Sequence, residues 1–280
     1  ENEKQMKHIT IYNSNSKKRY LKKFKSNLPF EHIVIEKFLK KDSAIKILKN
    51  FKINKNWINY SFVNNYRKYA LRNKKYMNKT LKELISELGS KKFINLLSEI
   101  TGMENIFLDP TLDGGGLHQI FNGGSLNIHT DYNSHYKEKK WKRVLNLLIY
   151  LNKDWKKKYK GELELWNSIG TRKVKSYVPS FNRCIIFKTG KKSYHGHPVK
   201  LKIPKNFSRK SIAVYYFVKQ EKDLKLSPTK YISRPSDKFS DQILIKIDMF
   251  LNNFLSFFKR YNLFNDELAS RVLSLINKNK

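Results

Sequence analysis

The chain has 280 residues, 40% of them hydrophobic and 14% aromatic, which is enough apolar surface for one large folded domain or two small ones. The formal net charge of +35 favours polyanions, but lysine outnumbers arginine and is spread over the whole chain, which indicates a solvated basic surface and makes nucleic acid a less favoured partner. Because no run of 18 apolar residues occurs and the single cysteine cannot form an intrachain disulfide, we expect a protein without a transmembrane segment in a reducing compartment, the cytoplasm.

The first third of the chain is predicted to be mainly helical. Residues 1–28 are polar and lysine-rich and receive no assignment, apart from residues 9–12 as a candidate edge strand. His32–Ile35 is expected to form a short strand, and Asp42 to cap a helix over residues 44–51.

Two further helices are predicted downstream. Thr80 and Glu83 form a capping box, which predicts that a helix begins here and ends at Gly89. Ser90 is expected to cap a second helix that ends at Gly102, because the apolar residues between them recur at the spacing of one buried helical face. This helical third, followed by a strand-rich middle, suggests helices packed against one sheet of a double-sheet β structure.

Glycines mark turns in the middle of the chain. Residues 114–116 and 123–124 are glycines that bracket residues 117–121, and so predict strand, turn and strand leading into His129. A glycine-rich phosphate loop is the competing interpretation, but no helix beginning with Lys-Ser or Lys-Thr follows.

This segment ends in the triplet His129-Thr-Asp131. On an extended strand, residues two apart lie on the same side and about 6.6 Å apart at Cα, so the imidazole and the carboxylate can converge on one cation. Three apolar, strand-like runs follow, at residues 143–152, 182–187 and 208–217.

A second pair of histidines, His195 and His197, follows the second of these runs, 64 residues after Asp131 (195 minus 131). With Gly196 between them, both side chains can face the same way, and either one can join His129 and Asp131. Two histidines and one carboxylate on one face of an iron, with positions left open, form the ligand set of non-haem Fe(II) oxygenases.

In this order the motifs resemble the Fe(II)- and 2-oxoglutarate-dependent dioxygenases, in particular their prolyl-4-hydroxylase-like branch. The resemblance covers residues 114–217 and rests on five signals: the His-x-Asp triplet, Tyr-Leu-Asn-x-Asp-Trp from Tyr150, Gly-Glu-Leu-Glu-Leu from Gly161, the distal His195, and Arg-x-Ser from Arg209. It implies an α+β fold with a double-stranded β-helix (jelly-roll) core buttressed by N-terminal helices, and a C-terminal helical extension.

The resemblance also suggests the domain organisation. A single oxygenase domain is expected over residues 1–220, with a helical part at 30–105 and the jelly-roll core at 106–220. Residues 221–280 are expected to form a linker and the C-terminal helical extension.

Individual residues receive roles from the same resemblance. His129, Asp131 and His195 are the expected catalytic metal ligands, with His195 preferred to His197 because related hydroxylases place the ligand histidine directly before a glycine. The residues expected to bind the cosubstrate are Arg209, Ser211, Tyr150, Asn146 and Gln119. The planar guanidinium of Arg209 suits the distal carboxylate of 2-oxoglutarate, which it can bind through two parallel hydrogen bonds.

The implied cofactors are Fe(II), 2-oxoglutarate and O2, with ascorbate as an optional addition, and the implied reaction hydroxylates an unactivated C–H bond with release of succinate and CO2. A prolyl residue in a protein or peptide is the preferred substrate, and a small molecule such as a free amino acid, sugar or lipid, or a nucleic acid, is the alternative. His118 and Trp166 are candidate substrate contacts, and a structural role is the preferred alternative for each. A non-catalytic β-sandwich binding module would lack a metal ligand or Arg209, and all are present. A zinc hydrolase would need a general base, and no His-Glu-x-x-His motif supplies one.

The last part of the chain predicts an amphipathic helix over residues 243–264. Its apolar residues recur at a spacing of three and four and form one aromatic stripe: Ile247, Phe250, Phe254, Phe257, Phe258 and Tyr261. We expect this stripe to pack on the domain or on a second copy of the chain, as in a homodimer. A basic amphipathic helix on a membrane surface is the alternative.

Overall fold

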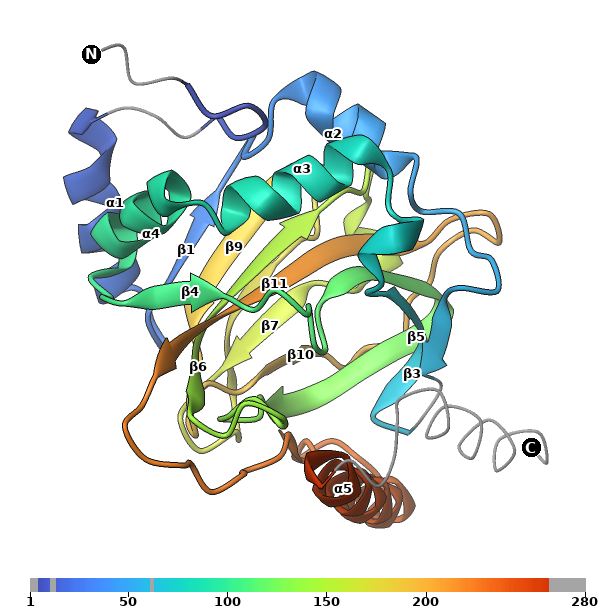
Figure 1. The fold of residues 1–280 in the computed structure, drawn as a ribbon. Helices are drawn as coiled ribbons and strands as arrows, with labels where there is room; N and C mark the ends of the chain where they lie inside the picture. The colour runs from blue at the N-terminus through green and yellow to red at the C-terminus, as the bar shows by residue number, and fades with distance from the viewer. Residues whose placement is uncertain (1–4, 11–13, 61–62, 262–280) are drawn as a thin grey trace.

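The computed structural model describes residues 5–10, 14–60 and 63–261. Within these residues the fold is one curled antiparallel sheet with a few helices, most of which lie on one side of it (Figure 1). The described helices are α1 (Ser14–Ser26), α2 (Lys41–Leu48), η1 (Lys74–Tyr76), α3 (Lys79–Leu88), α4 (Lys91–Thr101), η2 (Lys157–Tyr159) and α5 (Phe239–Arg260).

The strands of the sheet come from almost the whole length of the described chain. They are β1 (His32–Ile35), β2 (Ile58–Tyr60), β3 (Asn65–Leu71), β4 (Ile106–Leu108), β5 (Gly116–Thr130), β6 (Trp141–Tyr150), β7 (Leu163–Trp166), β8 (Lys173–Tyr177), β9 (Arg183–Lys188), β10 (His195–His197), β11 (Arg209–Lys219) and β12 (Lys230–Tyr231). The main path through the sheet is β1-β9-β6-β11-β5-β10-β7-β8, while β3 and β12 pair with β5, β2 with β3, and β4 with β11.

The long strand β5 is the point where the sheet curls over. Its first half pairs with β11, where Ile120 lies opposite Arg209. Its second half pairs with β10, where His129 lies opposite His195. One strand therefore brings two segments that are distant in the sequence to the same interior.

The predicted turn at residues 123–124 is wrong, because β5 runs through it without a break. Gly123 has a φ of 79°, which is in the left-handed region that favours glycine. A Cβ on Gly124 would lie 2.8 Å from the carbonyl oxygens of Phe121 and Tyr66. The two glycines thus form an irregularity that bends one strand, and do not separate two.

Alternation along β9 shows how the sheet separates two apolar clusters. Cys184 and Ile186 belong to the large core that also contains Leu84 of α3 and Leu97 of α4. Ile185 and Phe187 belong to a smaller cluster with Leu163 and Leu165 of β7, because successive side chains point to opposite faces. Cys184 is fully buried, as its apolar surroundings in the sequence predicted.

Helix caps were predicted with mixed success. Ser90 caps α4 by accepting from the amide of Phe93, and Gly102 ends that helix in the left-handed conformation, as predicted. The prediction of Thr80 as a cap is wrong, since the cap lies two residues earlier, at Asn78, whose side chain accepts from the amide of Leu81. Asp42 is also not a cap, because it lies inside the first turn of α2, where a carboxylate still favours the positive helix end.

At the N-terminal end, His32–Ile35 forms the predicted strand β1. The unassigned segment contains helix α1, and Ile9 bridges to Leu39, whereas residues 11 and 12 of the candidate edge strand lie outside the described residues. The hairpin of β2 and β3 has no counterpart in the sequence-based prediction.

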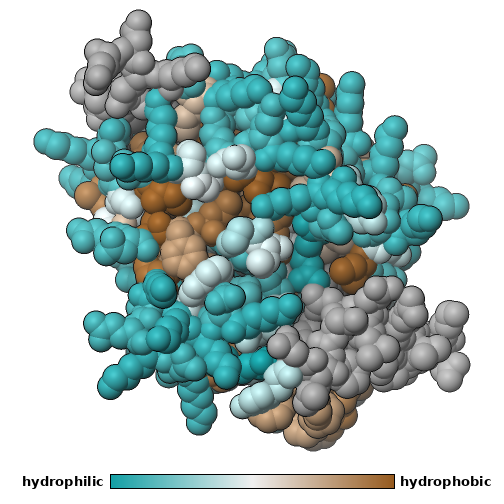
Figure 2. Space-filling model, viewed as in Figure 1, coloured by the Kyte–Doolittle hydropathy of each residue, from teal (hydrophilic) through white to brown (hydrophobic). Residues whose placement is uncertain are grey.

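Helix α5 docks through one side only. Ile245 and Asp248 are buried, and Asn64 donates a hydrogen bond from its side-chain amide to the Asp248 carboxylate. The predicted stripe faces outward, because Ile247, Phe250 and Phe254 are more than half exposed among the described residues, and Figure 2 shows apolar side chains on this helix at the lower edge of the molecule. These residues therefore do not pack on the domain, and the alternative that the stripe packs on a second copy of the chain stays a prediction. None of the helices in the described ranges is long and apolar enough to span a bilayer.

Candidate metal centre

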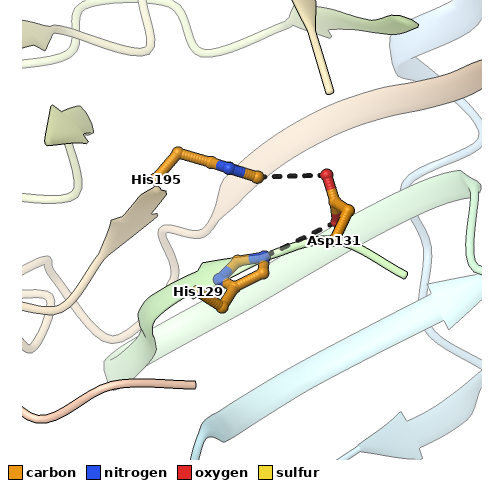
Figure 3. Close-up of side chains that lie close together, drawn as sticks. All are labelled: His129, Asp131 and His195. Carbon is orange, nitrogen blue, oxygen red and sulfur yellow. Dashed lines mark ion pairs between the residues drawn. The ribbon is translucent and has the colours of Figure 1, made fainter. Parts of the chain in front are cut away.

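Three side chains converge beside the second half of β5. His129 lies near the end of β5, and Asp131 is the first residue after this strand. His195 begins β10 and lies opposite His129. The Nε2 atom of His129 is 3.8 Å from Oδ1 of Asp131, and Nε2 of His195 is 3.5 Å from Oδ2 (Figure 3). The three ligand atoms lie within 4.8 Å of one another, so one metal ion can reach all three.

Both imidazoles are held in the orientation that a metal ligand needs. Nδ1 of His129 lies 2.8 Å from the carbonyl oxygen of Asn127, and Nδ1 of His195 lies 2.9 Å from that of Ser193. A protonated Nδ1 donates to each carbonyl, which leaves the lone pair of Nε2 facing Asp131. Burial, followed by the nearby His195, lowers the pKa of His129 to about 3, so this ring is neutral at pH 7, as metal ligation requires.

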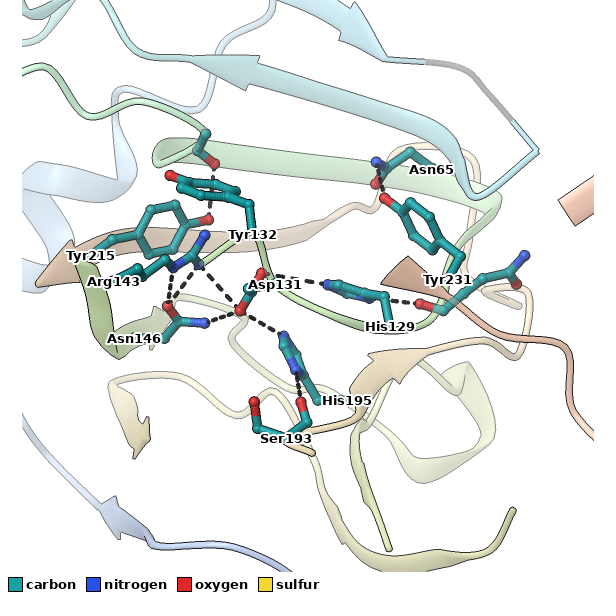
Figure 4. Close-up of polar contacts among 12 residues, drawn as sticks. Asn65, His129, Asp131, Tyr132, Arg143, Asn146, Ser193, His195, Tyr215 and Tyr231 are labelled. Atoms are coloured by element: carbon teal, nitrogen blue, oxygen red, sulfur yellow. Dashed lines mark hydrogen bonds and ion pairs between the residues drawn. The ribbon is translucent and has the colours of Figure 1, made fainter. Parts of the chain in front are cut away.

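Asp131 receives support from a buried polar network (Figure 4). The side-chain amide of Asn146 donates to its Oδ2 at 2.7 Å, and Nη2 of Arg143 lies 3.3 Å from the same oxygen. Burial alone would raise the pKa of the Asp131 carboxyl, but Arg143, the two histidines and Asn146 together hold it below its usual range. The carboxylate is therefore ionised at neutral pH.

Arg143 is itself fixed on every side. Its Nε and Nη2 donate to Oδ1 of Asn146 at 2.9 and 2.7 Å. The guanidinium carbon lies 3.4 Å from the ring centroid of Tyr215 and 4.5 Å from that of Tyr132. The sequence-based prediction missed Arg143, although a charged residue at the start of an apolar strand run was a signal for a buried ion pair.

The metal cluster opens onto a cavity of about 290 Å³. Arg209 and Tyr150 line it on the side of β11 and β6, and both are buried. Nε of Arg209 donates to the carbonyl of Gly161 at 2.8 Å, and Nη2 lies 3.3 Å from the Tyr150 hydroxyl. Arg209 thus brings a buried guanidinium to the cavity wall, which suits an anion in the cavity.

His197 lines the same cavity without joining the three-residue cluster. It is 2% exposed, and neither of its ring nitrogens has a hydrogen-bond partner among the described residues. Burial, and then the charge of Arg209, lowers its pKa well below the usual value. Orphaned polar atoms beside a buried guanidinium fit a polar, anionic molecule in this space. The cavity thus suits 2-oxoglutarate, and the three-residue cluster suits Fe(II).

The other predicted residues divide by the face of the sheet on which they lie. Ser211 and Asn146 line the cavity, and so does His118. The prediction of Gln119 as a pocket residue is wrong, because its neighbours His118 and Ile120 line the cavity while its own amide donates to Ser208 at 2.9 Å.

Trp166 also lies away from the cavity. It packs with Ile128 and Tyr194 and donates its indole N–H to Glu164 at 2.9 Å. It is absent from the residues that line the cavity, which favours the structural role of this residue.

Two parts of the cavity wall were not expected from the sequence. Strand β3 contributes Lys68, and Arg72 directly follows this strand. The segment after residue 220 contributes Pro228 and Tyr231. The ring of Tyr231 lies 5.2 Å from that of His129, because β12 pairs with β5 at this position.

The comparisons with known proteins agree with this geometry. Residues 115–217 match the family model of the 2OG-Fe(II) oxygenase superfamily. The fold is similar to that of a Trichoplax adhaerens prolyl hydroxylase, solved in complex with a hypoxia inducible factor oxygen degradation domain peptide fragment (17% identity, TM-score 0.53, 72% of this chain and 91% of that chain). It is also similar to a Pseudomonas putida prolyl-4-hydroxylase (12% identity, TM-score 0.50, 71% of this chain and 99% of that one). No curated protein matches the sequence.

Proposed function

Because residues 115–217 form a 2OG-Fe(II) oxygenase domain, we propose that this dioxygenase hydroxylates an unactivated C–H bond of a prolyl residue in a protein or peptide. The observation that carries the proposal is the convergence of His129, Asp131 and His195 on one point at the wall of the cavity that Arg209 also lines. We also propose that the curled sheet is a double-stranded β-helix, with β5 crossing between its two layers.

In this proposal neighbouring groups hold each metal ligand in the protonation state and orientation that metal binding requires. His129 and His195 present Nε2 because their Nδ1 atoms are engaged by carbonyls. Asp131 presents an ionised carboxylate because Arg143 and Asn146 hold its Oδ2. Three protein ligands on one side leave the other positions of Fe(II) open, and the bound iron supplies the redox chemistry that couples O2 to C–H hydroxylation.

Arg209 and Tyr150 are proposed to bind the distal carboxylate of 2-oxoglutarate. The guanidinium is already oriented by Gly161 and lies over the Tyr150 ring at 4.9 Å, so it loses little freedom when the anion binds. His197 can donate one further hydrogen bond from a ring nitrogen that has no partner among the described residues. In the net reaction, 2-oxoglutarate, O2 and R–H give succinate, CO2 and R–OH.

The prolyl substrate is supported by fold likeness. The Trichoplax adhaerens and Pseudomonas putida proteins with a similar fold are both named prolyl hydroxylases, and the first was solved with a peptide fragment. The identities are 17% and 12%, so the choice of a prolyl residue depends on experiment.

The test is an anaerobic titration with Fe(II) and 2-oxoglutarate, followed by succinate measurement in air with and without proline-containing peptides. We expect iron-dependent succinate formation, a mass increase of one oxygen in a peptide, and loss of both in the variant Asp131→Ala. Well-folded, iron-loaded protein that forms no succinate would refute the enzymatic function. Succinate formation without any modified prolyl peptide would refute the substrate alone.

A further inference from the structure

Lys68 is a basic residue that the proposed function does not use. It lies on β3, opposite Ile120 of β5, and lines the cavity together with His118 and Arg209. Its side chain is half-buried, and within residues 5–10, 14–60 and 63–261 its ammonium group has no hydrogen bond or ion pair. A half-buried ammonium group that lines a cavity can take its partner from a molecule that fills the cavity, so this position indicates an anion from outside the chain.

The other basic residues that line the cavity have assigned partners. Arg143 is held by Asn146 and Asp131. Nη1 of Arg72 lies 2.8 Å from Oδ1 of Asp113. Arg209 is oriented for one carboxylate of the cosubstrate, so Lys68 is the basic group left over.

The charge of the lining leads to the same conclusion. Four basic side chains face two carboxylates: Lys68, Arg72, Arg143 and Arg209 against Asp113 and Asp131. His129 and His195 are neutral as metal ligands, and burial lowers the pKa of His118 well below its usual value, so these rings add no charge at pH 7. Fe(II) and the dianion of 2-oxoglutarate cancel each other, so the loaded cavity keeps an excess of two positive charges, four minus two.

We propose that Lys68 binds a carboxylate of the molecule that is hydroxylated, so that the primary substrate is an acid. Two sources have this chemistry: the carboxylate of a free amino acid, and an acidic side chain beside the reacting residue of a peptide. This inference rests on the proposed function, because it names the substrate class of the same cavity.

Electrostatics at Lys68 agree with this assignment. Burial lowers its pKa to about 8, an effect that Asp131 opposes and that Arg209, Arg72 and Arg143 reinforce. The ammonium is still the major form at pH 7, and a carboxylate beside it would raise the pKa again. The cosubstrate is the weaker candidate for this contact, because Arg209 is assigned to its distal carboxylate and its other carboxylate would bind the metal held by His129, Asp131 and His195.

The test measures binding, so it does not depend on turnover. The full chain is loaded with Mn(II) and 2-oxoglutarate and titrated calorimetrically with two matched pairs: L-proline and L-prolinamide, and N-acetyl-Glu-Pro-Gly-amide and N-acetyl-Gln-Pro-Gly-amide. In at least one pair we expect the acid to bind about 10- to 100-fold more tightly, the usual effect of a hydrogen bond to a charged partner. The pair that shows the preference identifies the source of the carboxylate.

Variants assign the preference to one side chain. Lys68→Gln should abolish it, Lys68→Arg should keep part of it, and Lys82→Gln, on the exposed side of α3, should behave like the wild type. The affinity for 2-oxoglutarate should stay within about 3-fold in all variants, since a lost ion pair costs more than that.

Two results would overturn the inference. One is a wild-type protein that binds neither acid more tightly than its amide. The other is a Lys68→Gln variant in which 2-oxoglutarate affinity falls while the preference for the acid persists, which would assign Lys68 to the cosubstrate. A protein that prefers the acid but forms no succinate with iron would refute the hydroxylase function and leave Lys68 as an anion site.

Discussion

Arg143 offers the sharpest test of how the chain prepares its metal site. Replacing it by methionine keeps much of the side-chain volume but removes the positive charge 3.3 Å from Oδ2 of Asp131. In the metal-free protein the Asp131 carboxylate would then be buried without its counter-charge, and the loss of one partner of a buried pair costs about 3–5 kcal/mol. In the metal-loaded protein the cation neutralises the carboxylate, so the loss reduces to the unpaired Oδ1 of Asn146, about 1–3 kcal/mol.

These two costs differ by about 2 kcal/mol, and by linkage Arg143→Met should therefore bind a divalent metal about 30-fold more tightly than the wild type. Loss of Arg143 also leaves the Asp131 carboxylate less firmly oriented, which would weaken metal binding. Because Asn146 still donates to Asp131 at 2.7 Å, the effect of the charge should be the larger one. The assay combines urea unfolding with and without Mn(II) and calorimetric Mn(II) titration. Arg183→Met is the control, because Arg183 is half-buried and its ion-pair partner Glu36 is exposed, and such a pair near the surface should contribute about 1 kcal/mol or less.

The contrast with Asn146→Ala decides between charge and orientation. That variant keeps the guanidinium but removes the amide that holds Asp131, so metal affinity should fall by about 10- to 100-fold. If Arg143→Met weakens Mn(II) binding as much as Asn146→Ala does, Arg143 acts by orienting the carboxylate, and the electrostatic reasoning is refuted.

Three further predictions concern the cosubstrate, the pH dependence and the bend in β5. Arg209→Met should weaken 2-oxoglutarate binding by about 10- to 100-fold while Mn(II) affinity without cosubstrate is unchanged, and equal binding by both proteins in calorimetry would contradict its role. Burial depresses the pKa of His129 and His197 below the unfolded value of 6.5, so their contribution to stability is present above that pH and is lost as the pH falls. The metal-free protein should therefore unfold at a lower urea concentration at pH 5.5 than at pH 7.5. Equal unfolding midpoints at the two pH values would contradict this. Gly124→Ala should destabilise by about 1–3 kcal/mol, because its Cβ would contact backbone oxygens at 2.8 Å, whereas Gly190→Ala, with nothing within 4 Å, should leave the melting temperature nearly unchanged.

The sequence was sufficient for the residues whose function depends on local spacing. His129 and Asp131 are two apart on a strand, and His195 and Arg209 each open a strand of their own. The structure brings these four residues to one cavity because β10 and β11 both pair with β5. The order of the apolar runs in the sequence suggested strands here, but it did not predict which residues would lie opposite one another.

Where sequence reasoning failed, the cause was strand phase or tertiary pairing. Gln119 was placed on the wrong face, because a shift of one residue reverses every side chain of a strand and no local signal fixes that phase. Arg143 depends on Tyr215, which approaches it only when β6 and β11 pair, and on Tyr132, which follows β5. Lys68 depends on a pairing between β3 and β5 that joins residues about 50 positions apart, which no periodicity within either strand reveals.

The residues that line the cavity come from two parts of the chain, one inside and one outside the range that matches the oxygenase family model. The metal ligands, Arg209 and Tyr150 all fall within residues 115–217, the part that matches the oxygenase family model. Lys68, Arg72 and Tyr231 line the same cavity from outside that range. The matched part thus holds the residues assigned to the metal and the cosubstrate, and the flanking walls offer further side chains for contacts with a substrate. Substitutions at Lys68 or Tyr231 should therefore change which molecule is bound before they change whether succinate is formed, and the opposite order of effects would place substrate selection within the family core.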